Sequence, residues 1–269
     1  MRLLLSVTTI CGCMLMANGQ NFHLVGAKST ALNHASVALK TPEAFFHNSA
    51  ISSRFEKTTF VSGYSNPWLL NSFQNQFLAA YIPGEKGAWS AGFRIQGDND
   101  FLLHKTGFGY ALKLNQRFSI GVQCHLLGLH LSNGYGRKLT AVADAGILVK
   151  LTEKLSLGTS VQNIGRSSIS RELNERFATQ MRIGIQYDVS KKVKLLSELR
   201  KTDQSSPNLN FGLLYQWNDK WAFSCGTGFL PSSFAFGFNL KLKQIRVYFA
   251  SSYQAPFGWT PAITLALEL

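Results

Sequence analysis

Charged side chains are scarce in this 269-residue sequence. Asp, Glu, Lys and Arg make up 15% of it, against roughly 25% in an average soluble domain. Acidic residues are the scarcest, since 27 Lys and Arg face 14 Asp and Glu, a formal net charge of +13. Hydrophobic residues nevertheless reach 45%, with 20 Phe. Such a composition argues against a disordered chain, and the length fits one large domain or two small ones.

Long apolar runs are also missing. Beyond the first residues there is no uninterrupted run of about 18 apolar residues, which argues against a helical membrane protein. Residues 1–19 are predicted to be a secretory signal peptide, with Arg2, an apolar stretch over 3–16 and a small-residue cleavage site at 17–19. The stretch 10–13 weakly imitates a lipoprotein signal, but the apolar region continues past it, so we expect no lipid anchor.

Sequence signals for a cofactor or metal are lacking. Removal of the signal peptide leaves two cysteines, Cys124 and Cys225, and neither Cys-x-x-Cys nor a Cys/His ligand spacing occurs. We predict that both are small apolar wall residues. The six His residues show no metal-ligand spacing, and Gly107-Phe108-Gly109 lacks the following helix of a dinucleotide loop. We therefore predict neither a cofactor nor a metal.

From about Thr58 onward the hydrophobic pattern has a period of two, as in strands whose two faces differ. In one segment Trp89, Ala91, Phe93 and Ile95 alternate with Ser90, Gly92, Arg94 and Gln96. About fourteen strands of roughly ten residues are predicted. They begin near Thr58, Phe73, Gly87, Thr106, Phe118, Leu139, Leu155, Phe177, Val193, Asn208, Trp221, Ser233, Ile245 and Pro261.

The links between these strands alternate in length. Tight links at 115–117, 152–154, 190–192, 218–220 and 243–244 carry turn residues and charges, and links such as 98–105, 133–138 and 165–175 are mostly longer. This pattern is typical of an up-and-down transmembrane β-barrel with both chain ends on the short-turn, periplasmic side. A secreted sandwich also alternates, but its polar face would carry many charges. Here that face is mainly Gly, Ser, Gln and Asn, which favours a barrel lumen.

The basic excess has two interpretations in a barrel. Loop and rim residues can pair with lipopolysaccharide phosphates; these are Arg137, Lys138, Arg166, Arg171 and Lys201. A second set is expected to project inward: Arg94, Lys113, Lys150, Arg182 and Arg246. Inward cations favour anions in a wet lumen, or else they pair with Asp144, Asp188 and Glu198 inside a closed wall. A signal peptide and a membrane barrel argue against nucleic acid as the partner.

The segment before the first strand carries a resemblance. Its residues 26–39 read GAKSTALNHASVAL, and residues 43–50 read EAFFHNSA. They resemble the N-terminal motif of the PorV/PorQ and FadL-like outer-membrane barrels, especially those of the Bacteroidota. Further matches are Tyr135-Gly136, Leu157-Gly158, the run 162–165 and the closing run 258–261. Ser49 stands where that family has Pro, and Asn33-His34 occupy a patch that is usually rich in Gly.

This resemblance implies a fold and two activities. In FadL-like channels the N-terminal segment enters the lumen as a hatch and the barrel passes hydrophobic molecules, whereas PorV-like relatives serve the type IX secretion system. By resemblance, residues from 20 to about 53 form a plug. The chain then divides into a signal peptide (1–19), a plug or hatch-like segment (20–57) and a transmembrane barrel (58–269).

One motif suggests catalysis instead. The run His130-Leu131-Ser132-Asn133 resembles the His-x-Ser motifs of outer-membrane phospholipase A and lipid A deacylase. Residues two apart share a strand face, so His130 could activate Ser132 as a nucleophile. That face points toward lipid near the long-loop rim, and the expected neighbours, Thr106 and Phe108 on one strand and Leu139 and Ala141 on the other, supply no group to orient the imidazole. A polar rim with a turn is the alternative.

The sequence thus predicts a non-enzymatic outer-membrane β-barrel of about 14 antiparallel strands with a short N-terminal plug. Its expected activity is passage of a small hydrophobic solute or an accessory role in type IX secretion. The alternative is an acyl hydrolase that uses His130 and Ser132. Expected partners are outer-membrane lipid and lipopolysaccharide, and secretion components in the accessory case.

Overall fold

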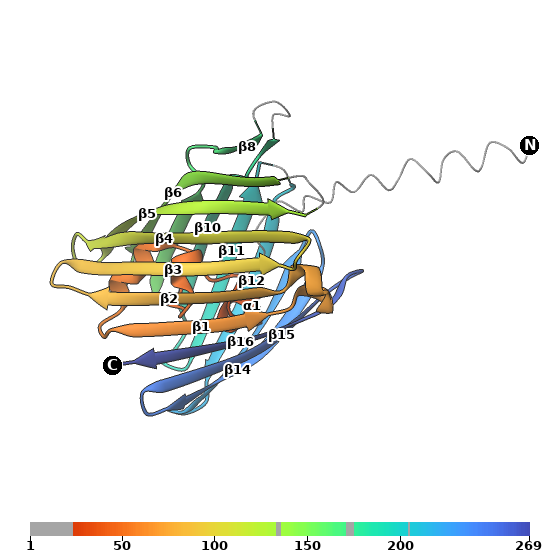
Figure 1. The fold of residues 1–269 in the computed structure, drawn as a ribbon. Helices are drawn as coiled ribbons and strands as arrows, with labels where there is room; N and C mark the ends of the chain where they lie inside the picture. The colour runs from red at the N-terminus through yellow and green to blue at the C-terminus, as the bar shows by residue number, and fades with distance from the viewer. Residues whose placement is uncertain (1–23, 133–135, 171–174, 204) are drawn as a thin grey trace, which may run out of the picture.

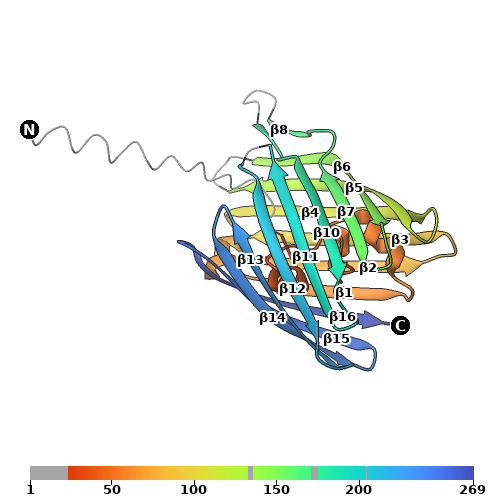
Figure 2. The same ribbon diagram turned by 180° about the vertical axis from the view of Figure 1, so that it is seen from behind.

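Fourteen strands in the described part of the chain close into an antiparallel barrel (Figures 1 and 2). The computed structural model describes residues 24–132, 136–170, 175–203 and 205–269, so the predicted signal peptide lies outside it. The wall strands are β1 (Thr59–Ser65), β2 (Asn75–Pro83), β3 (Gly87–Gly97), β4 (Phe101–Lys113), β5 (Phe118–Leu131), β6 (Gly136–Lys150), β7 (Leu155–Gln162), β10 (Gln180–Asp188), β11 (Val193–Thr202), β12 (Asn208–Gln216), β13 (Trp221–Phe229), β14 (Ser233–Leu242), β15 (Ile245–Gln254) and β16 (Gly258–Glu268).

The wall follows chain order and closes where β1 pairs with β16. A separate small hairpin of β8 (Ser168–Ser170) and β9 (Glu175–Arg176) lies in the link between β7 and β10. Closure pairs every strand on both sides, which leaves no backbone edge for lipid to meet. The predicted all-β, up-and-down barrel is therefore confirmed.

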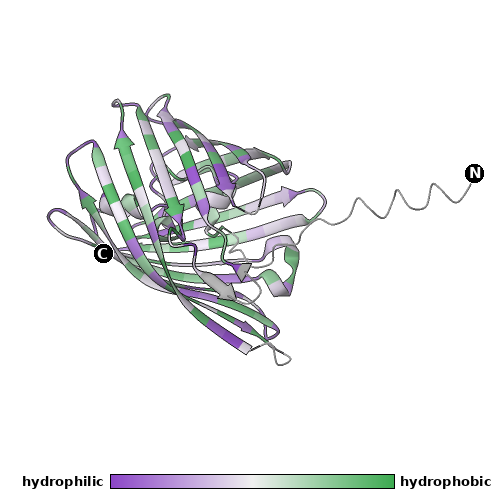
Figure 3. Cartoon of the chain, turned by 90° about the horizontal axis from the view of Figure 1, so that it is seen from above, coloured by the Kyte–Doolittle hydropathy of each residue, from purple (hydrophilic) through white to green (hydrophobic). Residues whose placement is uncertain are grey.

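Hydrophobic and hydrophilic residues alternate along the strands (Figure 3), and the large apolar side chains are the exposed ones. Along β10, Met181 and Ile183 are 55% and 49% exposed, while Arg182 between them is 1% exposed. This arrangement is the reverse of a soluble protein, since large apolar side chains cover the exterior and charged groups are enclosed. The sandwich alternative is wrong, because the apolar faces do not stack against one another. The protein is an outer-membrane barrel whose exterior faces hydrocarbon.

Aromatic side chains gather at the two ends of this exterior. On the short-turn side, the rings of Trp89 and Tyr110 lie side by side, tilted by 53°, with centroids 4.7 Å apart. On the long-loop side, Trp259 contacts Phe234 and Tyr253 at 5.5 and 5.1 Å. Amphipathic rings prefer the headgroup level of a bilayer, so the two groups indicate where the membrane ends.

The short links form as predicted. Asn115 Oδ1 accepts hydrogen bonds from the backbone N–H groups of Arg117 and Phe118, at 2.8 Å each, the local bond that makes Asn favourable in turns. Leu269 lies on this side, where its N–H bonds to the Thr58 carbonyl. The wall thus begins and ends on this side, where Thr59 pairs with Glu268, whereas Leu24, the first described residue, lines a cavity with Trp68 and Thr260 on the long-loop side.

Four strand starts, those of β4, β6, β10 and β16, differ from the predicted ones by three residues or more. The fourth strand begins at Phe101 instead of near Thr106, and β10 begins at Gln180 instead of near Phe177. Inward Leu103 packs with Leu127, Leu129, Val142 and Phe177 in an apolar cluster within the barrel. Both faces of this end of β4 are therefore apolar, and the contrast between faces that reveals a strand is lost there.

Residues 24–57, hereafter the plug, lie mostly inside the barrel, where Figure 1 shows them in red and orange behind the wall strands, and end in Glu56 and Lys57, which are exposed at the short-turn rim. The plug consists of a short helix α1 (Ala27–Ala31) and the 3-10 turns η1 (Ala44–Phe46) and η2 (Ser49–Arg54). Two further turns, η3 (Pro67–Leu69) and η4 (Asn71–Phe73), belong to the link between β1 and β2. No helix among the described residues is long and apolar enough to cross a membrane.

Inward-facing glycines make room for the plug. A Cβ atom added at Gly121 would lie 2.5 Å from the Ala50 backbone nitrogen, and one at Gly158 would lie 2.3 Å from the Val37 carbonyl oxygen. Plug atoms crowd the same position on other strands: Gly92, Gly146, Gly184, Gly212, Gly226 and Gly237. The Gly-rich polar face noted in the sequence is thus the inner wall against which the plug backbone packs.

Candidate functional site: the plugged lumen

A buried ion pair on the wall holds the middle of the plug. Arg182 of β10 donates through Nε to Glu198 Oε1 of β11 at 2.6 Å and through Nη2 to Oε2 at 3.0 Å. Glu198 Oε2 also accepts from the backbone N–H groups of Ser36 and Val37, at 2.9 and 2.8 Å. Arg182 Nη2 donates to the His34 carbonyl at 3.0 Å. The pair therefore satisfies polar groups of the plug as well as its own charges, which is what makes a buried ion pair tolerable.

His47 connects this ion pair to the start of the plug. Its Nδ1 lies 2.7 Å from Arg182 Nη1, and its Nε2 lies 2.7 Å from the Val25 carbonyl oxygen. An arginine only donates, so Nδ1 is the acceptor and Nε2 carries the proton. Burial and the neighbouring Arg182 hold the pKa of His47 well below its ordinary value. His47 is thus a neutral link between wall and plug.

A second polar cluster lies on β4, β5 and β6. Asp144 Oδ2 is 2.6 Å from Lys105 Nζ and 3.0 Å from His125 Nε2, and Oδ1 accepts from the Asn163 N–H at 2.8 Å. The His125 ring meets Phe45 of the plug edge to face, with centroids 5.3 Å apart. This carboxylate is neutralised within the wall, and the plug covers the cluster with an aromatic ring.

The inward cations predicted from the sequence divide into three groups. Arg182 and Arg94 are buried, and Arg94 donates to Asn75 Oδ1 at 2.6 Å. Arg246 is partly exposed and pairs with Glu268 at 3.2 Å, and Lys150 is half-buried. Lys113 is exposed at the short-turn rim instead of lying in the lumen.

The predicted inward acids all have cationic partners. Glu198 pairs with Arg182, Asp144 with Lys105, and Asp188 with Lys194 at 2.9 Å. Pairing inside a closed wall, one of the two interpretations offered by the sequence, is therefore shown for Arg182 with Glu198, whereas Asp144 and Asp188 pair with Lys105 and Lys194, which were not among the predicted cations.

The sequence did not identify Lys105 and His125 as site residues, because the strand pattern gives only the alternation of apolar and polar faces. Their polar side chains at inward positions of β4 and β5 were the available signal. His47 was not identified either, because the plug has no strand period.

A carboxylate fixes the plug's first helix. Glu43 Oε1 accepts from the Ser29 N–H at 2.6 Å, and the Glu43 side chain packs against Gly26, whose φ of 96° favours glycine. Burial raises the pKa of Glu43 to about 7, against the opposing effects of the Ser29 hydrogen bond and nearby Lys28. On the wall, the Tyr81 hydroxyl accepts from the Phe45 N–H and donates to the Pro42 carbonyl, at 2.8 Å each. Glu43 thus fastens the helix to the η1 turn within the plug, and Tyr81 fastens the η1 turn to the wall.

One cavity lies at each mouth of the barrel. The long-loop vestibule, about 230 Å³, is lined by Leu24, His34, Pro67, Trp68, Gln180, Arg200, Thr202, Ser205, Ser252, Gln254 and Thr260. The short-turn vestibule, about 240 Å³, is lined by Lys28, Leu39, Lys40, Thr41, Pro42, Phe55, Thr59, Gln186, Lys194, Arg246, Tyr248, Ala266 and Glu268. Drug-sized ligands occupy about 300–1,000 Å³, so each vestibule fits only a small molecule. Both cavities are bounded by the plug.

The basic loop residues proposed to meet lipopolysaccharide have mixed surroundings. Lys138 is exposed, whereas Lys201 donates to the Ser205 carbonyl at 2.6 Å. Arg137 donates through Nε to His130 Nδ1 at 3.2 Å, and Arg166 is exposed with φ 49°. Arg171 lies outside the described residues. Pairing with lipid phosphates stays a prediction.

The predicted nucleophile and base do not bond to each other among the described contacts. The Ser132 hydroxyl donates to Asp100 Oδ1 at 2.9 Å, while His130 Nδ1 accepts from Arg137. The expected neighbours of His130 were wrong, because the register opposes it to Leu102 and Arg137. Each of the two groups thus has another hydrogen-bond partner, which favours a polar rim. Asn133 lies outside the described residues.

The described residues show neither a disulfide nor a metal site. Cys124 and Cys225 are both free thiols exposed on the lipid-facing surface. Within the described residues, no three His, Cys, Asp or Glu side chains are grouped to hold a metal ion.

Fold and lumen together define the class: a transmembrane 14-strand barrel closed by its own N-terminal segment. No protein-family model matches the sequence, and no curated protein matches it. Solved structures do match. The CymD monoaromatic hydrocarbon channel superposes with a TM-score of 0.69 at 12% identity, covering 93% of this chain and 98% of that one.

Two further solved structures extend this likeness. The Pseudomonas putida toluene transporter TodX gives a TM-score of 0.69 at 10% identity, covering 93% of this chain and 99% of its own. A Pseudomonas aeruginosa FadL homologue gives 0.62 at 10% identity, with 92% and 99% covered. At these identities the likeness shows the fold, which is that of FadL-like channels. The FadL half of the resemblance is thus confirmed for architecture, and the PorV/PorQ half stays a prediction.

Proposed function

We propose that this protein is an outer-membrane channel for a small hydrophobic solute, with the plug as its gate. The observation that carries the proposal is a lumen with a small cavity at each mouth and a bonded but noncovalent plug between them. The solved structures with this fold include proteins described as hydrocarbon channels and toluene transporters, which supports the same class of solute here.

The plug offers an apolar route along one side of the barrel. Phe46 packs against Phe77 of β2 with centroids 5.4 Å apart, and Phe55 stacks on Tyr81 at 3.9 Å. A shift of the plug away from β2 would open a passage between these rings. An aromatic lining suits an apolar solute and supplies no dense set of hydrogen-bonding groups for a sugar or an amino acid.

The test combines uptake with a locked plug. A Cβ at Gly237 would lie 2.7 Å from the Ala31 Cβ, so the pair Ala31→Cys and Gly237→Cys can form a disulfide after an outward shift of about 1 Å. Both natural wall cysteines are replaced by Ala in this background. Uptake of a radiolabelled monoaromatic hydrocarbon is measured in cells that lack other hydrophobic-solute channels. We expect uptake above the empty-vector level, its loss on oxidation and its recovery on reduction.

Each single-cysteine variant controls for the substitutions themselves. Uptake at the vector level with the folded, unlocked protein contradicts the channel. Uptake that is unchanged by the formed disulfide contradicts the plug as the gate.

A second function rests on the tightness of the plug. Val25, Phe45 and Ile51 are at most 1% exposed, and a permanently filled barrel suits an accessory protein that presents its loops to a secretion machinery. The sequence resemblance to PorV/PorQ points to the type IX system. Purification from native membranes separates the two functions, since a co-purifying translocon supports the accessory role and a solitary barrel supports the channel.

A further inference from the structure

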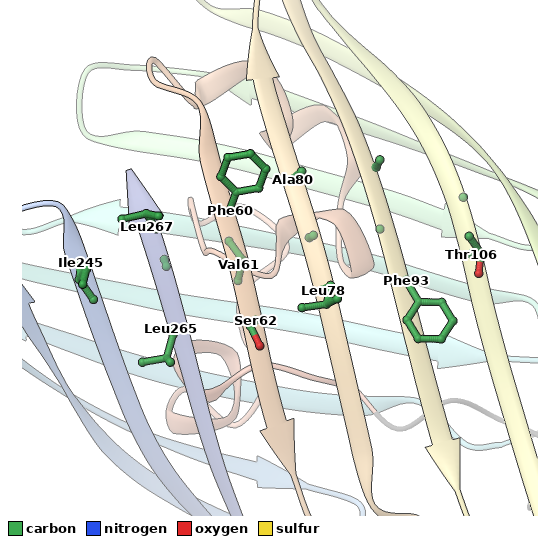
Figure 4. Close-up of a pocket in the computed structure, with 15 residues that line it drawn as sticks. Phe60, Val61, Ser62, Leu78, Ala80, Phe93, Thr106, Ile245, Leu265 and Leu267 are labelled. Carbon is green, nitrogen blue, oxygen red and sulfur yellow. The ribbon is translucent and has the colours of Figure 1, made fainter. Parts of the chain in front are cut away.

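A large cavity lies outside the barrel, on the lipid-facing wall (Figure 4). It is a groove of about 630 Å³ across β16, β1, β2, β3 and β4, and its lining is almost entirely apolar. We call it the acyl groove and define it by Phe60, Ser62, Leu78, Ala80, Ala91 and Phe93.

Strand register explains why the wall is hollow here. Ala80 lies opposite Ala91 on the neighbouring strand, and this small pair is flanked in its row by Phe60 and Phe108. The next row places Leu78 opposite Phe93. Two adjacent methyl side chains surrounded by rings and Leu therefore leave a depression.

The surroundings of this depression indicate its occupant. Ala80 and Ala91 form its floor, and the bounding rings of Phe60 and Phe108 lie three strand spacings apart, about 14 Å. The wall faces lipid tails at this depth, so a hydrocarbon chain is the occupant that the membrane supplies.

The groove lies toward the short-turn end of the wall. The next outward residues on its two central strands are Ile82 and Trp89, which pair with each other. Trp89 belongs to the aromatic group that indicates the headgroup level on this side. The floor of the groove thus begins just inside the interface of the periplasmic leaflet, which consists of glycerophospholipids.

Positive charge surrounds the headgroup end of the groove. Lys57, Lys86 and Lys113 are exposed on the segments that lead into β1, β3 and out of β4, and Lys243 precedes β15. The described residues give none of these four lysines a carboxylate within 4 Å. Glu56 and Glu85 are the acidic side chains on the same segments, so the rim is basic on balance.

We propose that the acyl groove binds one acyl chain of an anionic glycerophospholipid of the periplasmic leaflet, with the lipid phosphate at Lys57 and Lys86. The wall supplies an apolar recess, and the rim supplies cations at the depth where a phosphate lies. This site is separate from the lumen and does not depend on the channel function.

The first experiment maps the chain. The full barrel is placed in nanodiscs containing phosphatidylglycerol with a diazirine on its acyl chain, irradiated and digested for mass spectrometry. We expect crosslinks concentrated on β1, β2 and β3. Ala91→Phe fills the floor and should remove them. The matched control, Ala143→Phe, changes an exposed outward Ala of β6 and should keep them.

The second experiment tests the headgroup. Lipid retention is measured by native mass spectrometry with phosphatidylglycerol and with phosphatidylcholine. Each lysine near an anionic lipid contributes about fivefold to binding, so Lys57→Gln with Lys86→Gln should weaken phosphatidylglycerol retention by about 25-fold. Lys191→Gln, on an exposed turn of the β10–β11 link, should leave it unchanged.

Two results would overturn the proposal: crosslinks spread evenly around the barrel, or equal retention of the two lipids.

Discussion

At the scale of single residues, the Arg182–Glu198 pair bonds the wall to the Ser36 and Val37 N–H groups and to the His34 carbonyl of the plug. Both side chains are at most 1% exposed, and loss of one partner leaves a buried charge without compensation. Arg182→Ala should therefore lower the free energy of unfolding by about 3–5 kcal/mol. Urea titration of the purified barrel, followed by its heat-modifiable migration, measures this.

The control for that variant is Arg246→Ala. Its partner Glu268 and Arg246 itself are about one quarter to one third exposed, so the expected loss is about 1 kcal/mol or less. Equal losses in the two variants would contradict the anchoring role of Arg182.

Glu43 makes the stability of the folded protein depend on pH, and the direction of that dependence follows from its raised pKa. Burial raises its pKa from 4.5 to about 7, so between these values the folded protein holds a proton that the unfolded chain has released. Stability from this group falls as pH rises through that window, with a slope of at most about 1.4 kcal/mol per pH unit. Glu43→Gln should flatten the stability profile between pH 4.5 and 7. Parallel profiles for the two proteins would show that Glu43 does not titrate there.

The wall cysteines report which face meets lipid. Cys124 and Cys225 lie among outward apolar side chains, so a charged, membrane-impermeant maleimide should leave both unlabelled in intact membranes and label them after denaturation. Peptide mapping identifies the labelled thiols. Rapid labelling of either cysteine in folded, membrane-embedded protein would contradict the outward assignment.

At the scale of elements, the plug and the wall are held by different bonds. Wall strands close through backbone ladders that do not involve the plug. Deletion of residues 24–54 should therefore leave a folded, heat-modifiable barrel with a wet lumen, in which small sugars pass and liposome swelling becomes fast. A folded deletion variant that swells no faster than the intact protein would contradict the plug as the barrier.

The elements also show what could be predicted from the sequence. Strands such as β3 and β10 were predicted within a few residues, because lipid and lumen demand opposite side-chain types at alternate positions. The start of β4 was not, since Leu103 faces an apolar cluster inside the barrel. The path of the plug could not be derived from a period, because its short turns are fixed by long-range partners such as Glu198. Only the resemblance pointed to a plug.

The candidate site was less predictable than the wall. Arg182 and Glu198 were both predicted to face inward, but their pairing depends on the register between β10 and β11. Register also misplaced the neighbours of His130, where a shift of a few residues along β4 and β6 replaced Thr106 with Leu102 and Leu139 with Arg137. Sequence alternation gives the face of a residue and leaves its neighbour across the sheet undetermined.

At the scale of the whole molecule, link lengths predict the orientation in the membrane, with the longer links at the cell surface. An epitope inserted after Ser232, in the exposed link between β13 and β14, should be bound by antibody on intact cells. The same epitope inserted after Asn218, in the turn between β12 and β13, should be bound only after permeabilisation. The reverse pattern would invert the assignment of the two vestibules and of the acyl groove.

The glycines on the inner wall make the lumen complementary in shape to the protein's own N-terminal segment. An added side chain at these glycines would meet plug atoms, backbone at Gly121, Gly158 and Gly226 and side chains at others, so a larger residue on either partner collides and a smaller one leaves a void. Plug and wall must therefore change together as the protein diverges, and a segment transplanted from another barrel will not seat in this one.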